Sequence, residues 1–443
     1  MKSINFRLWF SIAFLMLLPA VYSTVRVYYL HSLPDTWSFS IAAQSAWLHL
    51  AYEVLQEAVI LPLYFVFGQV VADKVELRSR VSSSIFYALI AFATLTVLTW
   101  VMSAVIVDGM SVAPEARDMT VSFIRLESLA ILVNTINDLS VVVLVVLGRY
   151  RLLMALAALR AVLVIVFDTV FLGQTAISLD WGVLGVAATN ISVGLVFAVA
   201  SVWLLFRLKL VGSARVVLKK GTIRKWRNLA VLSAVESAVR NLAFSLMILK
   251  LVNEVNEAGT FWVANGFIWG WLLLPILSLG TLIKQDAAVH EGRLGPRLRA
   301  YFLITGLIAV LWLVSIPVWN WFIGSAMGAP EPEKITELAT LMLAFFIVFS
   351  FNNILDSYLY GMGRIDLIVA QALLVNVLYY GGAFVLYQSD IFQPTLTKIA
   401  LLFGFGIVAD SLVTVVQFWR FGYFKIASSA SFQSSFNQQR RHS

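Results

Sequence analysis

The sequence lacks cysteine, which excludes disulfide bonds, thiolate metal sites and cysteine nucleophiles. Charged residues are scarce: they make up 13% of the 443 residues, against about 25% in soluble proteins. The four histidines are scattered without the spacing of metal ligands, so we expect no zinc or haem site. Apolar residues reach 60% and the mean hydropathy is +0.87, which is too apolar for a water-soluble domain. The chain therefore needs a membrane around it.

Long apolar runs predict the membrane spans, because a bilayer core of about 30 Å takes roughly 20 helical residues. We expect an all-α integral membrane protein with about twelve transmembrane helices. They are predicted near 8–30, 41–70, 81–107, 119–147, 152–173, 182–206, 228–251, 259–283, 300–323, 337–361, 366–388 and 397–420. The first run is longer than the apolar region of a signal peptide and lacks a clear cleavage site, so we interpret it as a span.

Lys and Arg are unevenly distributed over the segments that join these spans. With a cytoplasmic N-terminus, 24 of the 32 fall on inner segments and three on outer ones. This split follows the positive-inside rule. It predicts an inner (cytoplasmic) membrane protein with both termini in the cytoplasm. The net charge of +8 then reflects topology, so we expect no nucleic-acid partner.

The basic loop 207–227 divides the chain, and internal repeats support the division. "GRYRLLMALAAL" from Gly148 resembles "GRIDLIVAQALL" from Gly363, and "VILPLYFVFG" around Pro62 resembles "WLLLPILSLG" around Pro275. The two offsets, 215 and 213 residues, are nearly equal, which indicates duplication of a six-helix unit. We therefore predict two pseudo-symmetric lobes, 1–206 and 228–425, joined by the 207–227 loop. A polar, disordered cytoplasmic tail is predicted over 426–443.

Two transporter superfamilies share a plan of six plus six helices. The loop "GQVVADKVELRSR" (68–80) approaches the G-x-x-x-D-[RK]-x-G-R-[RK] pattern of major facilitators, but the Gly68–Asp73 spacing is one residue too long and the second Gly is absent. Spans five and six fit another family better. They contain "GRYR" at Gly148–Arg151, an acidic residue at Asp168, and "GVLGVAATN" at Gly182–Asn190. In this order the motifs resemble the multidrug and toxic compound extrusion (MATE) family of transporters.

Acidic residues inside the spans are candidates for function, because each costs at least about 2.5–3.5 kcal/mol to insert. At about 1.5 Å per residue, Glu236, Asp356 and Asp410 lie roughly 12, 8 and 15 Å from the cytoplasmic ends of their spans. These depths allow the three carboxylates to share one site with nearby amides. Carboxylate and amide oxygens suit Na⁺, and burial of a carboxylate equally suits a proton carrier. The predicted cation site comprises Glu236, Asp356, Asn353 and Asp410. Candidates for substrate binding or proton relay are Glu53, Glu57, Asp138, Asn137 and Asn241.

The resemblance implies a further role for some of these residues. In one branch of the MATE family a Glu on span seven and an Asp on span ten bind the cation, and Glu236 and Asp356 occupy those spans. Another branch uses an Asp in span one, where this chain has no acidic residue and carries Arg26. Glu53 and Glu57, or Asp138, would then substitute for it.

A structural reading competes with each of these roles. Arg240 follows Glu236 at i+4, the spacing of an ion pair within one helix. Arg26 is a possible counter-ion for Glu53 and Glu57. Arg125 and Glu127 are expected to reach the membrane interface, and Asp168 to join a polar network.

Together these features predict a secondary-active antiporter that exports amphipathic, cationic organic molecules while Na⁺ or H⁺ enters. Aromatic residues in spans eight and ten are candidates for its substrate pocket. The competing interpretation, favoured for any single residue, places them against lipid or at the membrane interface. The Walker A pattern is absent, so no ATP-driven step and no cofactor other than the coupling ion is expected. The partners would be a small organic substrate and membrane lipids, and the chain would be a monomer. Alternatives are a lipid-linked saccharide flippase of the same superfamily, a major-facilitator-type transporter, and a membrane enzyme, for which no catalytic cluster is apparent.

Overall fold

The computed structural model describes residues 6–68, 70–71, 73–173, 175–210, 220–290 and 292–428. Over these residues the chain is helical and has no strand. Residues 211–219 of the predicted inter-lobe loop and 429–443 of the predicted tail lie outside the described residues.

The helices of the first half of the chain follow the predicted spans closely. They are α1 (Phe6–His31), α2 (Ser38–Ala43), α3 (Ser45–Val59), α4 (Leu63–Gly68), α5 (Lys74–Gly109), the short 3₁₀ helix η1 (Pro114–Ala116), α6 (Arg117–Val146), α7 (Tyr150–Phe171) and α8 (Leu184–Arg207). The predicted span 41–70 is the exception, because it is broken into α2, α3 and α4. The second break precedes α4 at Pro62, whose ring removes a backbone N–H from the helix.

The second half contains α9 (Lys220–Phe244), η2 (Ser245–Leu249), α10 (Lys250–Glu254), α11 (Ala258–Phe267), η3 (Ile268–Leu272), α12 (Leu274–Val289), α13 (Pro296–Trp321), η4 (Phe322–Ala326), α14 (Pro332–Gly361), α15 (Ile365–Leu374), η5 (Val375–Tyr380), α16 (Gly381–Gln388), α17 (Leu396–Arg420) and α18 (Tyr423–Ser428). Here η2 to η5 are π-helical turns that continue their neighbours. Nine helices of the described residues are long and apolar enough to cross a membrane, or ten if α11–η3 and α12, bent by 53°, form one span. The chain is a multi-pass membrane protein.

Contacts divide the chain into two compact units. The first unit is Val21–Trp262, and the second is Met1–Ala20 together with Val263–Ser443. Helix α9, which the sequence assigned to the C-terminal lobe, belongs to the first unit because it packs along α3. The division of the sequence into two similar halves at 207–227 stays a prediction about ancestry.

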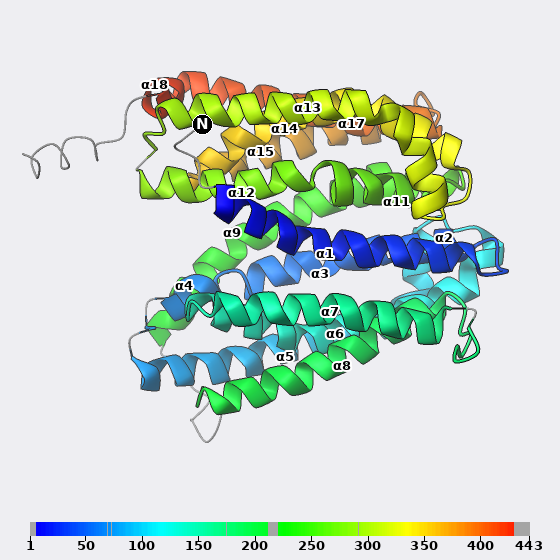
Figure 1. Ribbon diagram of the computed structural model, residues 1–443, viewed down its shortest axis with the longest axis horizontal. Coiled ribbons are helices and arrows are strands. Elements are labelled where there is room, and N and C mark those ends of the chain that lie inside the picture. Colours follow the sequence, from blue (N-terminus) through cyan, green and yellow to red (C-terminus); the bar gives the residue numbers. More distant parts are fainter. Residues whose placement is uncertain are drawn as a thin grey trace, which may run out of the picture. The chain divides into compact units, whose positions relative to one another are not determined.

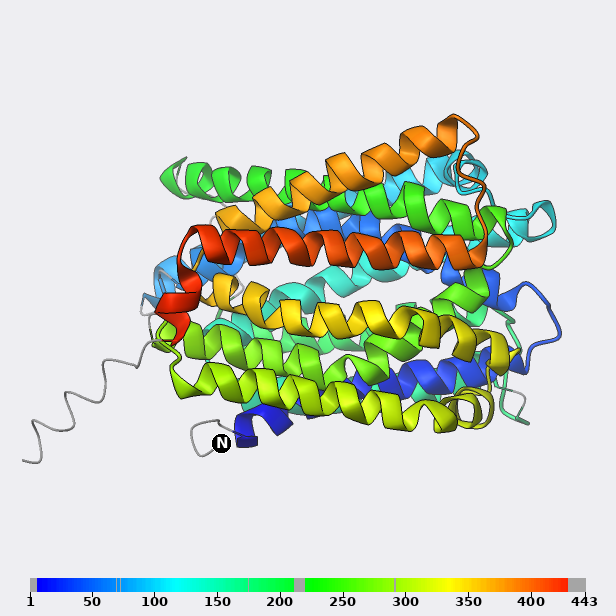
Figure 2. The same cartoon turned by 90° about the horizontal axis from the view of Figure 1, so that it is seen from above.

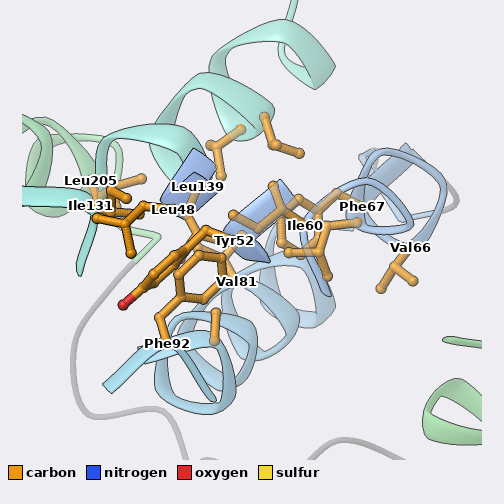
Figure 3. Close-up of a cluster of buried hydrophobic side chains, with 14 of the residues drawn as sticks. Leu48, Tyr52, Ile60, Val66, Phe67, Val81, Phe92, Ile131, Leu139 and Leu205 are labelled. Carbon is orange, nitrogen blue, oxygen red and sulfur yellow. The ribbon is translucent and has the colours of Figure 1, made fainter. Parts of the chain in front are cut away.

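In the first unit α6 is the central helix and contacts α3, α5, α7 and α8 (Figure 1). Figure 3 shows part of its core, in which Tyr52 of α3 lies against Phe92 of α5 and near Ile131 of α6. The Tyr52 hydroxyl is 2.8 Å from Thr96 Oγ1, so this buried polar group is satisfied. The core fixes α3 and α6, which carry several of the candidate residues.

In the second unit α14 occupies the corresponding central place and contacts α12, α13 and α17. Figure 2 shows α17 (red), α14 (yellow) and α13 (yellow-green) side by side. Helices α12 and α14 approach closely at Gly280, where an added Cβ would lie 2.7 Å from Asn353 Nδ2 and 2.8 Å from Ser357 Oγ. The ends of these two side chains would have to move to admit a larger residue.

The two glycines of the sequence repeat, Gly148 and Gly363, have the same backbone conformation. Gly148 and Gly363 have positive φ of 67° and 69°, and each ends a long helix. The next residue, Arg149 or Arg364, donates its N–H to the carbonyl five residues earlier at 2.9 Å in both turns. This is the hydrogen bond of a glycine C-cap. Other helix ends of this chain have the same hydrogen bond, for example Leu210 N–H to the Leu205 carbonyl, so duplication stays a prediction from the sequence.

Candidate functional site

Two carboxylates of the second unit lie close to each other, Asp356 on α14 and Asp410 on α17. Asp356 Oδ2 accepts a hydrogen bond from Asn352 Nδ2 at 2.8 Å, and the same amide nitrogen lies 3.4 Å from Asp410 Oδ2. Thr414 Oγ1 donates to Asp356 Oδ1 at 3.1 Å. One amide therefore bridges the two carboxylates.

The helical repeat explains this arrangement. Asn352 and Asp356 are four residues apart on α14, and Asp410 and Thr414 are four apart on α17, so each pair shares one helix face. These two faces meet because α14 and α17 pack along each other. The predicted cluster of Asp356 with Asp410 is thus formed, with Asn352 as its bridge. Asn353, in contrast, donates to the Ile276 carbonyl on the neighbouring α12 at 3.2 Å.

Buried oxygen atoms at this cluster lack hydrogen-bond donors. Asn352 and Gln371 are only 4% and 3% exposed, yet Asn352 Oδ1 and Gln371 Oε1 have no hydrogen-bond partner within the described part of the chain. The Gln371 side chain approaches both carboxylates. Among the described residues no cation forms an ion pair with Asp356 or Asp410; the nearby Lys284 Nζ lies over the Tyr360 ring, 4.8 Å from its centroid. Two carboxylates and two free amide oxygens suit a hard cation or a bound proton.

A second cluster lies in the first unit, where one arginine contacts three glutamates. Arg240 of α9 donates to Glu236 Oε1 at 2.7 Å, to Glu57 Oε1 at 2.9 Å and to Glu53 Oε1 at 3.2 Å. The ion pair predicted within α9 from the i, i+4 spacing is therefore confirmed. The prediction that Arg26 is the counter-ion of Glu53 and Glu57 is wrong, because Arg240 takes that place.

This Arg240 cluster, comprising Arg240, Glu53, Glu57 and Glu236, joins α3 to α9. Asn241 extends it by donating to Glu53 Oε2 at 3.1 Å and to the Leu50 carbonyl at 2.8 Å. The side chains of Arg240 and Glu53 are 36% and 40% exposed, so the cluster is only partly enclosed. Glu236 is 8% exposed. The predicted joint site of Glu236 with Asp356 stays a prediction, since each has its described partners within its own unit.

The two remaining candidates lie on α6. Asp138 Oδ2 accepts a hydrogen bond from Gln56 Nε2 at 3.3 Å, across the α3–α6 contact. Asn137 donates to the Gly194 carbonyl at 3.3 Å and accepts from Ser201 Oγ at 3.2 Å, both on α8. Asn137 thus holds α6 and α8 together, whereas Asp138 is neutralised by no ion pair among the described residues.

Solved structures resemble this fold along nearly its whole length. No protein-family model and no curated protein matches the chain. A multidrug resistance MATE family transporter of the MOP superfamily, in its inward-facing conformation, matches with a TM-score of 0.73 and 15% identity over 95% of this chain and 98% of that one. A MOP superfamily transporter from Pyrococcus furiosus, described as having a binding pocket of reverse polarity, matches with a TM-score of 0.64 and 15% identity over 95% and 96%.

The chain has the MATE fold. The resemblance seen in the "GRYR" and "GVLGVAATN" segments is therefore confirmed at the level of structure, although the sequences have diverged widely. Among the plans of six plus six helices, the fold favours MATE over a major facilitator. The structural neighbours are transporters and not enzymes.

Within this MATE fold the first unit contains a buried network whose partners the sequence did not predict. Arg26 of α1 donates to both oxygens of Asp168 on α7, at 3.0 and 3.2 Å, and to Asn190 Oδ1 on α8 at 3.1 Å. Asn190 Nδ2 in turn donates to both oxygens of Glu127 at 2.9 and 3.0 Å. Asp168 joins a polar network as expected. Its partners could be found only by knowing which faces of four helices meet.

Two expectations near this network need correction or refinement. Glu127 is 2% exposed and bound by Asn190, so the prediction that it reaches the interface is wrong. Arg125, two residues earlier on another face of α6, donates to Ser103 Oγ at 2.8 Å and lies over the Trp100 ring. The aromatic residues of the predicted pocket include Trp269, which packs against Phe346 and Phe349 within the second unit.

Proposed function

We propose that this chain is a secondary-active transporter that exports amphipathic organic cations in exchange for Na⁺ or H⁺. The observation that carries the proposal is the pair Asp356 and Asp410, bridged by Asn352 and accompanied by two amide oxygens without a hydrogen-bond partner among the described residues. The fold supports it, because structures with this fold include proteins described as multidrug resistance transporters.

The negative charges of Asp356 and Asp410 support the binding of an ion that exchanges with the solution. Each carboxylate in a membrane costs at least about 2.5–3.5 kcal/mol, and two facing each other cost more unless a cation or proton neutralises them. The described residues supply Arg240 to the glutamates of the first unit but supply no ion-pair partner to Asp356 or Asp410. A Na⁺ ion or a proton from solution would fill this role. Because the ion leaves again, its binding can favour one conformation over another and so drive transport.

The excess of acidic over basic groups supports a cationic substrate. The Arg240 cluster has three carboxylates for one guanidinium, and the Asp356 cluster has two carboxylates and no paired cation among the described residues. A pyrophosphate-linked lipid, the substrate of the flippase alternative, would be repelled by such groups.

The proposal is tested with the purified full chain in proteoliposomes loaded with a fluorescent cationic dye. Dye movement is driven separately by a Na⁺ gradient and by a pH gradient. We expect transport with one of the two, and a loss of at least tenfold in Asp356→Asn and in Asp410→Asn. Asp390→Asn is the matched control, since Asp390 is exposed in the turn after α16 and the same atom is changed. It should transport like the wild type.

Other results would overturn parts of the proposal. Full gradient-driven transport in both variants would show that the ion does not bind at Asp356 and Asp410. Failure of the wild type to move any cationic dye, with translocation of a lipid-linked saccharide in the same vesicles, would favour the flippase. Direct ²²Na⁺ binding that disappears in Asp356→Asn identifies Na⁺, whereas proton uptake without Na⁺ binding identifies H⁺.

A further inference from the structure

A pocket in the first unit lies outside both acidic clusters. It has a volume of about 670 Å³ and is formed where α6 ends, α7 begins and α8 ends. Its wall contains Leu144, Leu152, Leu204 and Leu208 together with Arg149 and Arg151. The pocket thus combines a hydrocarbon wall with two cationic groups.

Neither arginine has an acidic partner among the described residues. Both are exposed, and both belong to the "GRYR" turn between α6 and α7. Unpaired guanidinium groups beside a leucine-lined hollow are not needed for folding of the turn, because the backbone hydrogen bond of Arg149 already closes it. Their charge is available to an anion.

The internal repeat offers a direct comparison. The equivalent turn in the second unit is "GRID", in which Arg364 matches Arg149 and Asp366 matches Arg151. There the Arg364 guanidinium donates to both Asp366 oxygens at 2.9 Å and lies over the Phe421 ring. These hydrogen bonds raise the pKa of Arg364. The same backbone turn is neutralised internally in one unit, whereas in the other it carries two arginines that have no acidic partner among the described residues.

The position of the turn between α6 and α7 indicates which anion would bind there. It joins two membrane-spanning helices, so it lies at a membrane surface, and the distribution of Lys and Arg predicts the cytoplasmic one. At this depth the anion available next to a hydrocarbon wall is the phosphate of a lipid. Guanidinium groups bind phosphate oxygens through paired N–H donors, and basic pockets between helices on this side favour anionic lipids.

We propose that this pocket is a binding site for an anionic phospholipid, with its phosphate on Arg149 and Arg151 and an acyl chain along the four leucines. The site is separate from the proposed transport function. It would anchor the α6–α7 turn to the inner leaflet.

The test uses the purified full chain in detergent, titrated with phosphatidylglycerol or phosphatidylcholine of equal chain length. Retained lipid is counted by native mass spectrometry. We expect preferential retention of phosphatidylglycerol by the wild type. Arg151→Asp, which copies the second turn, removes one cation and neutralises the other, so retention should fall on the order of twentyfold. Arg299→Asp is the control, because Arg299 is exposed at the start of α13 and the same charge is changed away from the pocket. It should retain the lipid.

A second variant separates a lipid from free phosphate. Leu204→Gln places a polar group on the apolar wall and should weaken binding of long-chain phosphatidylglycerol more than that of glycerol phosphate. Equal retention of both lipids by the wild type, or equal losses in Arg151→Asp and Arg299→Asp, would overturn the site. If inorganic phosphate displaced the lipid at an equal concentration, the pocket would be a site for free phosphate and not for a phospholipid. A thermal unfolding curve in phosphatidylcholine confirms that each variant is folded.

Discussion

Arg26 and Asp168 form a bidentate ion pair from α1 to α7, with N–O distances of 3.0 and 3.2 Å. The side chains are 12% and 0% exposed, so the pair is largely shielded from water. By resemblance, one branch of the MATE family relies on an Asp in span one, where this chain carries Arg26 and no acidic residue. In this chain Asp168 has a permanent counter-ion, the guanidinium of Arg26.

The Arg26–Asp168 ion pair supports different roles for the two units. A carboxylate that is neutralised by a tethered arginine cannot exchange Na⁺ or H⁺ without breaking two hydrogen bonds. Asp356 and Asp410 have no such partner among the described residues. Ion coupling is therefore proposed for the second unit, and a structural role for the Arg26 network.

Replacing Arg26 should destabilise the protein strongly. Arg26→Gln leaves Asp168 buried and without its counter-ion, which costs about 3–5 kcal/mol. Thermal unfolding in detergent, followed by tryptophan fluorescence, should show a large fall in Tm. The double variant Arg26→Gln with Asp168→Asn removes both charges and should recover much of the loss. Equal losses in the single and double variants would contradict the ion pair as the cause.

The fold could be predicted largely because apolar length and charge are local properties of the chain. The segments 337–361 and 397–420 correspond closely to α14 and α17. The repeat at Gly148 and Gly363 was also visible, since a glycine that ends a helix leaves a sequence signature. The breaks in 41–70 were not predicted, because its apolar run is continuous and only Pro62 marks one of them.

The partners of the charged residues were harder to predict, because they depend on which helix faces meet. Glu236 and Arg240 are four residues apart, so their pair follows from spacing. Glu53 is 187 residues from Arg240, and their contact depends on the packing of α3 against α9. Depth grouped Glu236, Asp356 and Asp410; the structure brings Asp356 and Asp410 together through Asn352, and the joint site with Glu236 stays a prediction.

Replacing Arg240 should have an effect that depends on pH. Arg240→Gln leaves three carboxylates without their cation and should cost about 1–3 kcal/mol, less than at a fully buried site because the cluster is partly exposed. Protonation of a carboxylate relieves this repulsion, so the loss in Tm should be smaller at pH 5 than at pH 8. Glu57→Gln is the control: it leaves two carboxylates on Arg240 and should change stability less. A loss that is the same at both pH values would exclude repulsion as its cause.

The glycine of the repeated turn provides a test of backbone strain. Gly363 has φ of 69° and nothing within 4 Å of the position of a Cβ, so Gly363→Ala is strained only by its backbone, at about 1–2 kcal/mol. Gly382, inside α16, has equally open space and no positive φ, so Gly382→Ala should stabilise by about 0.5–1 kcal/mol. Opposite shifts in Tm are expected. Shifts of the same sign would mean that the turn is not held in this conformation.

The predicted orientation can be tested in cells because the chain has no cysteine. Single cysteines at Thr175 and Ser389 lie on segments predicted to be outside, and those at Lys74 and Arg299 on segments predicted to be inside; all four residues are exposed. A membrane-impermeant maleimide should label the first pair in intact cells and the second pair only after permeabilisation. This outcome follows from the 24 Lys and Arg residues on inner segments against three on outer ones. The reverse pattern would invert the topology, and with it place the Arg149 and Arg151 pocket at the outer leaflet. If Lys74→Cys were labelled in intact cells and Arg299→Cys were not, the number of membrane crossings between these two positions would be odd.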